Sequence, residues 1–84
     1  MPENPLPKEG MMTHGEFEKW VAGKVAEVPR DPSALRREAE GWRAYSRHVE
    51  SHPGDYQDAA WEIALGEKLA ERFEAAASEI EAAK

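Results

Sequence analysis

The sequence predicts an all-α protein: a small three-helix bundle with a long C-terminal helix and a disordered, proline-rich N-terminal tail. Three observations predict this fold class. Apolar residues recur at steps of three and four in three separate segments. Prolines lie between these segments rather than inside them. β-Branched residues are few and scattered, so the alternating pattern of a strand does not occur.

The chain of 84 residues has room for one domain, which we place at residues 13–84 behind a tail of residues 1–12. Three of the six prolines lie in the tail, at positions 2, 5 and 7. Proline lacks an amide donor and disfavours helical backbone at the preceding residue. We therefore expect the tail to be extended and to stay outside the core.

The first helix is predicted over residues 13–28. Thr13 and Glu16 have the spacing of a capping box, and Pro29 ends the segment. Its apolar residues share one helical face: Phe17, Trp20, Val21, Val25 and Val28. Gly23 lies in the middle, where glycine costs about 1 kcal/mol relative to alanine. It either permits a close helix crossing or is simply tolerated.

The second helix is predicted over residues 31–52. Asp31 is a good N-cap, and Pro32 stands at the first helical position, where its missing amide does no harm. Its face consists of Leu35, Ala39, Trp42, Ser46 and Val49, and Pro53-Gly54 is a stop signal. Another face carries Arg36, Arg43 and Arg47. We expect these arginines to pair with the acidic third helix, either of the same chain or of a second copy.

The third helix is predicted over residues 55–83, beginning at Asp55. Its apolar face is broad, and the helix is longer than its neighbours, so we expect its C-terminal part to be uncovered in a single chain. A second copy is the simplest cover. The predicted partner-binding residues are Trp61, Leu65, Leu69, Phe73, Ala76, Ala77 and Ile80. Trp61 lies away from the centre of the apolar face, so it is either a core residue or an interface residue.

Charge and composition exclude several classes of function. Lys and Arg total 11 against 17 Asp and Glu, and residues 55–84 hold eight of the acidic residues. The net charge of −6 argues against direct binding to nucleic acid or to an anionic membrane. No apolar run has the roughly 18–20 residues of a membrane span, and the N-terminus lacks the apolar core of a signal peptide. We therefore expect a cytoplasmic protein.

Candidate chemical groups are few. His48 and His52 are four residues apart and are weak candidates for metal ligands, with Asp55 or Asp58 as a third ligand. Two histidines at the end of a helix more often only complement the helix dipole. Cysteine is absent, and neither a glycine-rich phosphate loop nor an activated nucleophile is recognisable. The sequence therefore predicts neither an enzyme nor a bound cofactor.

These observations favour a non-enzymatic, acidic, helical protein-interaction module that forms a homodimer through its C-terminal helix. The alternative is an acidic inhibitor of the phage or mobile-element type. Such a protein would occupy the basic nucleic-acid-binding surface of a target, and the charge of residues 55–84 motivates this interpretation. A third interpretation is a metal-responsive module that uses His48 and His52.

Overall fold

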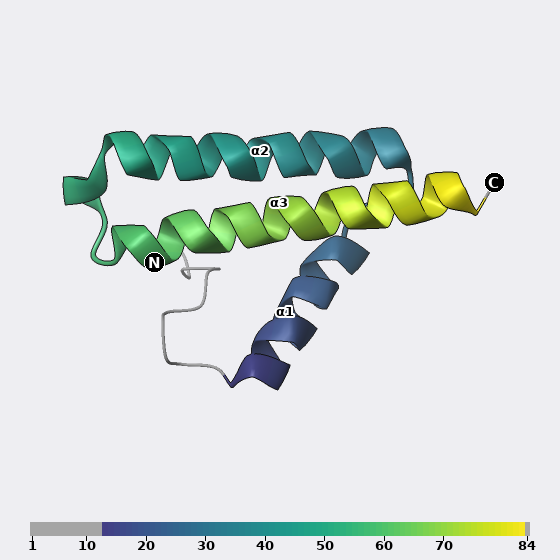
Figure 1. Ribbon diagram of the computed structural model, residues 1–84, viewed down its shortest axis with the longest axis horizontal. Coiled ribbons are helices and arrows are strands. Elements are labelled where there is room, and N and C mark those ends of the chain that lie inside the picture. The colour runs from purple at the N-terminus through teal and green to yellow at the C-terminus, as the bar shows by residue number, and fades with distance from the viewer. Residues whose placement is uncertain (1–12, 84) are drawn as a thin grey trace.

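The structure, a computed structural model, describes residues 13–83, and this part of the chain is helical without any strand (Figure 1). The element order is α1 (His14–Ala26), α2 (Pro32–Ser51), the short 3₁₀ helix η1 (Pro53–Asp55) and α3 (Ala59–Ala82). The prediction of an all-α protein with three α-helices is therefore confirmed. The expected tail, residues 1–12, lies outside the described residues.

The helices are arranged as a hairpin and a crossing helix. α2 and α3 lie side by side and antiparallel along their whole length, and α1 crosses α3 at a steep angle (Figure 1). The predicted three-helix bundle is therefore only partly present, because α1 does not lie along the other two helices. The reason lies in the contacts, because α1 packs mainly on α3 and not in the groove between both long helices.

Two helices begin at the predicted caps. Thr13 Oγ1 accepts the Glu16 N–H at 3.1 Å, and Glu16 Oε1 accepts the Thr13 N–H at 3.0 Å, which completes the capping box. These hydrogen bonds with Thr13 lower the pKa of Glu16. At α2, Asp31 Oδ2 accepts the Ala34 N–H at 3.1 Å. The capping rules therefore locate both starts correctly.

The start of the third helix differs from the expected one. Asp55 ends the single turn η1, and Tyr56 then adopts extended backbone with φ −124° and ψ 138°. Asp58 is the N-cap of α3, because its carboxylate accepts the Trp61 N–H at 3.4 Å. The predicted start at Asp55 is wrong because the chain needs an extended residue to cross from the end of α2 to the start of α3.

Most of the core belongs to the hairpin. The buried hydrophobic side chains among the described residues are Val21, Leu35, Ala39, Val49, Leu65, Leu69, Ala70, Phe73 and Ala77. All of these except Val21 lie on α2 or α3. Fully burying a leucine or phenylalanine side chain contributes about 1.5–3 kcal/mol. Hairpin formation therefore supplies most of the hydrophobic stabilisation, and α1 adds a smaller share.

A close helix contact holds the hairpin together at Gly66. A Cβ atom built on Gly66 would lie 2.2 Å from Ser46 Oγ and 3.0 Å from the Trp42 carbonyl oxygen. The buried Ser46 hydroxyl donates a hydrogen bond to the Ile63 carbonyl at 3.0 Å. Glycine is required here because any side chain would separate the helices. Gly23, in contrast, has open space around it, so it is tolerated rather than used for a crossing.

Candidate interaction surface

The predicted partner-binding residues of α3 divide into two groups. Four of them, Leu65, Leu69, Phe73 and Ala77, are at most 2% exposed, and they lie in the core of their own chain. The other three, Trp61, Ala76 and Ile80, are half-buried and pack against that core from its edge. A partner can therefore touch only the second group unless the fold opens.

The expectation that α3 ends in an uncovered overhang is wrong. α2 has 20 residues against 24 in α3, so the two antiparallel helices nearly match in length. Arg36, in the first turns of α2, donates to Glu81 near the end of α3, at 2.8 Å to Oε2. Arg43 donates to Glu74, seven residues further along each helix of the hairpin. Two of the three arginines of this face, Arg36 and Arg43, therefore pair with the acidic helix of the same chain, whereas Arg47 forms no such pair within residues 13–83.

Aromatic side chains gather where α1 meets α3. The Phe17 ring stacks on Trp20, with centroids 6.1 Å apart, and lies 5.8 Å from the Trp61 ring. The Lys24 ammonium lies 5.7 Å from the centroid of the Trp20 ring. All three rings remain half-buried. Trp61 was expected to be either a core residue or an interface residue, and it has features of both, because it packs on the core and also reaches the surface.

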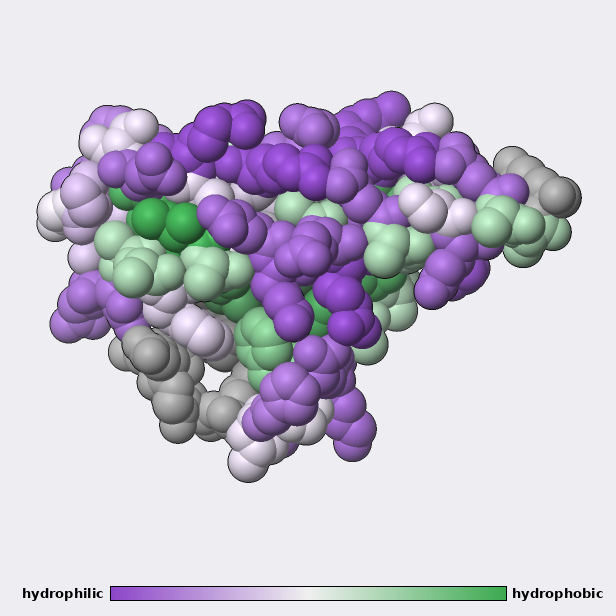
Figure 2. All heavy atoms as spheres, in the orientation of Figure 1, coloured by the Kyte–Doolittle hydropathy of each residue, from purple (hydrophilic) through white to green (hydrophobic). Residues whose placement is uncertain are grey.

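Ala76 and Ile80 extend this side of α3. They follow Arg72 by four and eight residues, so all three lie on neighbouring parts of one helical face. We call the half-buried set Phe17, Trp20, Trp61, Ala76 and Ile80 the α1–α3 surface. In Figure 2, hydrophilic side chains run along the outer side of α2, and hydrophobic ones appear where α1 meets α3.

An ionic contact fixes α1 on α3. Glu18 accepts a hydrogen bond from Arg72 at 2.7 Å, and Lys68 lies 3.8 Å from the same carboxylate. The sequence interpretation missed this contact. The available signal was the basic pair Lys68 and Arg72, four residues apart on an otherwise acidic helix, which indicates one positive face.

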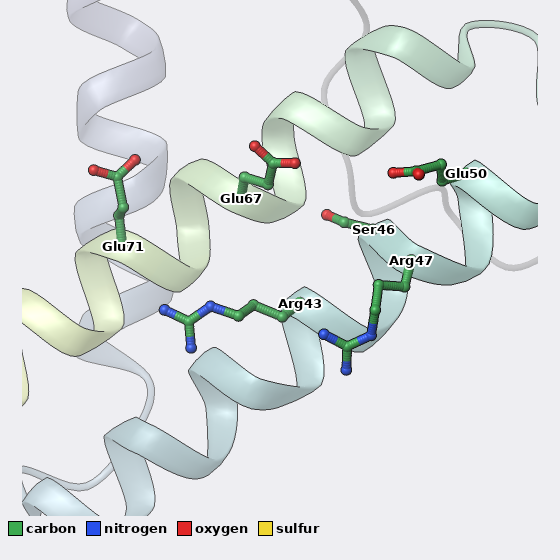
Figure 3. A pocket seen from close by; sticks show the side chains of 6 residues that line it. All are labelled: Arg43, Ser46, Arg47, Glu50, Glu67 and Glu71. Carbon is green, nitrogen blue, oxygen red and sulfur yellow. The ribbon is translucent and has the colours of Figure 1, made fainter.

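A polar groove of about 380 Å³ lies between α2 and α3 (Figure 3). Its lining residues are Arg43, Ser46, Arg47, Glu50, Glu67 and Glu71. Arg43 is held by Glu40 and Glu74, whereas Arg47, Glu50, Glu67 and Glu71 form no ion pair within residues 13–83. The Ser46 hydroxyl is used within the hairpin, because it donates a hydrogen bond to the Ile63 carbonyl.

The two candidate metal ligands stack on each other. The rings of His48 and His52 have centroids 4.5 Å apart, and Tyr56 meets His48 edge-on at 6.1 Å. His52 Nδ1 also lies 3.1 Å from the His48 carbonyl oxygen. Within residues 13–83, these histidines do not belong to any group of three or more side chains that could hold a metal ion. Of the two predicted third ligands, Asp55 ends η1, and Asp58 caps α3.

Tyr45 connects α2 to α3 at the end of the hairpin where the two histidines lie. Its hydroxyl donates a hydrogen bond to the Glu62 carboxylate, and its ring meets Trp42 and Tyr56 edge-on, with centroids 5.7 and 6.3 Å away. Burial raises the pKa of the Tyr45 phenol well above its ordinary value, and the contact with Glu62 adds to this effect. Tyr45 is therefore a structural donor.

Comparisons with protein-family models, with curated protein sequences and with solved structures give no match for this chain. Of the described helices, none has both the length and the apolar character that crossing a membrane requires.

Proposed function

We propose that this chain is a non-enzymatic protein-interaction module that pairs with a second copy of itself through the α1–α3 surface. One observation carries the proposal: large apolar side chains, among them Phe17, Trp20 and Trp61, remain half-buried on one side of the molecule. Tryptophan is enriched among residues that dominate binding energy. Covering such side chains is favourable by about 25 cal/mol per Å² of apolar surface.

The lengths of α1 and α3 also support the α1–α3 surface as the dimer interface. The 13 residues of α1 span about 20 Å, whereas the 24 residues of α3 span about 36 Å at 1.5 Å per residue. α1 also crosses α3 instead of lying along it (Figure 1). One side of α3 is therefore only partly covered, with Trp61 near its start and Ile80 near its end.

The charges near this surface suit a second copy. Glu18, Lys68 and Arg72 place both signs of charge beside the half-buried apolar residues. A twofold contact brings each patch against the same patch of its mate, so a surface with both signs is compatible with itself. A surface of one sign would repel its own copy.

Sedimentation equilibrium of Ile80→Glu tests the proposal. We expect the parent to sediment at twice its 9.4 kDa mass and Ile80→Glu to sediment as a monomer with unchanged helicity. Ala64→Glu is the matched control, because Ala64 lies exposed on another side of α3 and the added charge is the same. Phe73→Glu is unsuitable, since Phe73 is buried and a charge there would unfold the hairpin. A parent that is monomeric at every concentration would contradict the proposal.

The second candidate function is an acidic inhibitor that covers a basic nucleic-acid-binding surface of a target. It is favoured by Glu50, Glu67 and Glu71, which line one groove without ion pairs among the described residues. Three other carboxylates of α3 are already engaged by Tyr45, Arg43 and Arg36, which reduces the charge available to a partner.

Binding of a lysine-rich peptide tests this second candidate. We expect an inhibitor of this type to bind the peptide with an affinity that falls steeply as salt increases. Replacing all three groove carboxylates, Glu50, Glu67 and Glu71, by glutamine should abolish that binding. Binding that is absent at low salt, or equally strong in the triple variant, would contradict the inhibitor function.

A further inference from the structure

The aromatic part of the α1–α3 surface, which consists of Phe17, Trp20 and Trp61, lies next to the start of the described chain. Phe17 follows the N-cap Thr13 by four residues, and its ring lies 6.1 Å from Trp20 and 5.8 Å from Trp61. All three rings are half-buried. Residues 1–12 directly precede Thr13. The part of the chain outside the described residues therefore begins beside these three rings.

The start of α1 sets the direction from which the chain arrives. The capping box of Thr13 and Glu16 puts Met12 just before the N-cap and Phe17 at the fourth helical position. Where both of these positions are hydrophobic, the two side chains often pack on each other and fix the angle at which the chain enters the helix. Methionine sulfur also makes favourable contacts with aromatic rings. This pattern favours a contact between Met12 and the Phe17 ring.

The composition of residues 1–12 suits an aromatic surface. Seven of these residues are proline or apolar: Met1, Pro2, Pro5, Leu6, Pro7, Met11 and Met12. Prolines favour the polyproline II helix, which has three residues per turn and therefore places Pro2 and Pro5 on one side. Segments of this kind bind grooves that are lined by aromatic side chains. The chain therefore carries a segment whose chemistry matches its own half-buried rings.

The length of this segment is sufficient to cover the surface. At about 3.1 Å per residue in a polyproline II helix, 12 residues reach about 37 Å. Trp61 and Ile80 are 19 residues apart on α3, which corresponds to about 29 Å at 1.5 Å per residue. A short tether also gives an effective concentration in about the millimolar range. A contact that would be weak between separate molecules is therefore populated within one chain.

We propose that residues 1–12 fold back on their own chain, cover Phe17, Trp20 and Trp61, and compete there with a second copy. The competition rests on the proposed homodimerisation, whereas the contact with the rings does not. If the segment covers the rings for about two thirds of the time, about one third of each copy is free to pair, and the Kd of the dimer rises about ninefold. The segment is therefore an autoinhibitory element for pairing.

Methyl NMR tests the contact, because all three methionines of the chain lie in this segment, at positions 1, 11 and 12. The sample is the full chain with ¹³C-labelled methionine methyl groups, and it carries Ile80→Glu so that a second copy does not compete. We expect ring-current shifts of the Met11 and Met12 methyl signals, with nuclear Overhauser effects to the aromatic part of the α1–α3 surface.

The same sample contains a matched control ring. Trp42 is also half-buried, but it lies on α2 and meets Tyr45 at 5.7 Å. We expect no nuclear Overhauser effect between the methionines and Trp42. Methionine signals that show neither shifts nor contacts with the three rings would overturn the proposal. Contacts of equal strength with Trp42 would also overturn it, since the segment would then adhere without specificity.

Sedimentation equilibrium of two variants of the full chain tests the competition. The first variant replaces three apolar residues of the segment: Leu6→Ser, Met11→Ser and Met12→Ser. The control variant replaces its three charged residues: Glu3→Ser, Lys8→Ser and Glu9→Ser. Both variants keep the length and the prolines of the segment. We expect the apolar variant to form the dimer with a Kd about ninefold lower than that of the parent, and the control variant to keep the Kd of the parent.

The outcomes separate this inference from the proposed function. An apolar variant that pairs no more tightly than the parent overturns the competition and leaves the proposed pairing intact. An equal gain in the control variant also overturns the competition, since apolar contact is then not its cause. If the parent and both variants sediment as monomers, the proposed function and the competition both fail, and the methionine signals still decide the contact with the rings.

Discussion

Replacing Gly66 by alanine tests the closeness of the α2–α3 contact. Alanine favours a helix over glycine by about 1 kcal/mol, so propensity alone predicts stabilisation. The new Cβ, however, would lie 2.2 Å from Ser46 Oγ and 3.0 Å from the Trp42 carbonyl oxygen. Ser46 can rotate away only by giving up its hydrogen bond to Ile63, worth about 1 kcal/mol. The Trp42 backbone can respond only by moving α2.

The net effect follows from these magnitudes. Overpacking of a core typically costs about 1–3 kcal/mol. With the lost hydrogen bond and the propensity gain nearly cancelling, Gly66→Ala should destabilise the protein by roughly 1–3 kcal/mol. This is a large fraction of the roughly 4–13 kcal/mol expected for a chain of this length. Urea denaturation followed by circular dichroism at 222 nm measures the change as a lower midpoint.

Gly41→Ala is the matched control for this prediction. Gly41 is exposed within α2 and has open space around it, so alanine there should stabilise by about 0.5–1 kcal/mol. The double variant Gly66→Ala/Ser46→Ala removes the nearest clash and should be more stable than the sum of the single effects. If Gly66→Ala stabilises the protein as much as Gly41→Ala does, α2 and α3 do not approach each other closely at Gly66.

Three further predictions concern ionisable side chains. Burial and the contact with Glu62 raise the pKa of Tyr45. The contribution of Tyr45 to stability is therefore complete below the unfolded tyrosine pKa of about 10 and is lost at higher pH. Ultraviolet titration should show one phenol that resists ionisation, and this phenol should be missing in Tyr45→Phe. The hydrogen bond from Arg43 lowers the pKa of Glu74. The contribution of Glu74 to stability is therefore present above the unfolded glutamate pKa of about 4.3 and is lost as the pH falls. Glu74→Gln should reduce the loss of stability at acid pH, and an unchanged loss would contradict the pairing. Replacing His48 and His52 by alanine should change stability by less than about 1 kcal/mol, and calorimetric titration of the parent with zinc should show no binding that the variant lacks.

Local features of the fold were predictable from the sequence. The helix caps are local, because the capping side chains bond to backbone N–H groups only three residues away, as at Thr13, Glu16 and Asp31. Such short spacings can be recognised in the sequence. Proline positions likewise separate the helices. The start of α3 was misplaced because two aspartates, Asp55 and Asp58, both resemble N-caps, and only the path of the chain between α2 and α3 decides between them.

Tertiary features were harder to predict. An apolar stripe does not say which neighbour covers it, so Phe73 and Ala77 resembled an open interface although α2 buries them. The sequence predicts that Arg36 pairs with the third helix, but it does not identify the partner Glu81, which is 45 residues away along the chain. The direction in which α1 crosses α3 depends on which face of α3 is left uncovered once α2 has packed. The sequence pattern of α3 does not show which face that is.

The mass of the unmodified chain in solution tests the central claim most directly. Sedimentation equilibrium over a range of micromolar concentrations, at low and at high salt, reports both the assembly and its physical basis. Pairing through half-buried apolar side chains predicts twice 9.4 kDa, with little loss of dimer as salt increases. A mass of 9.4 kDa at every concentration would contradict the claim.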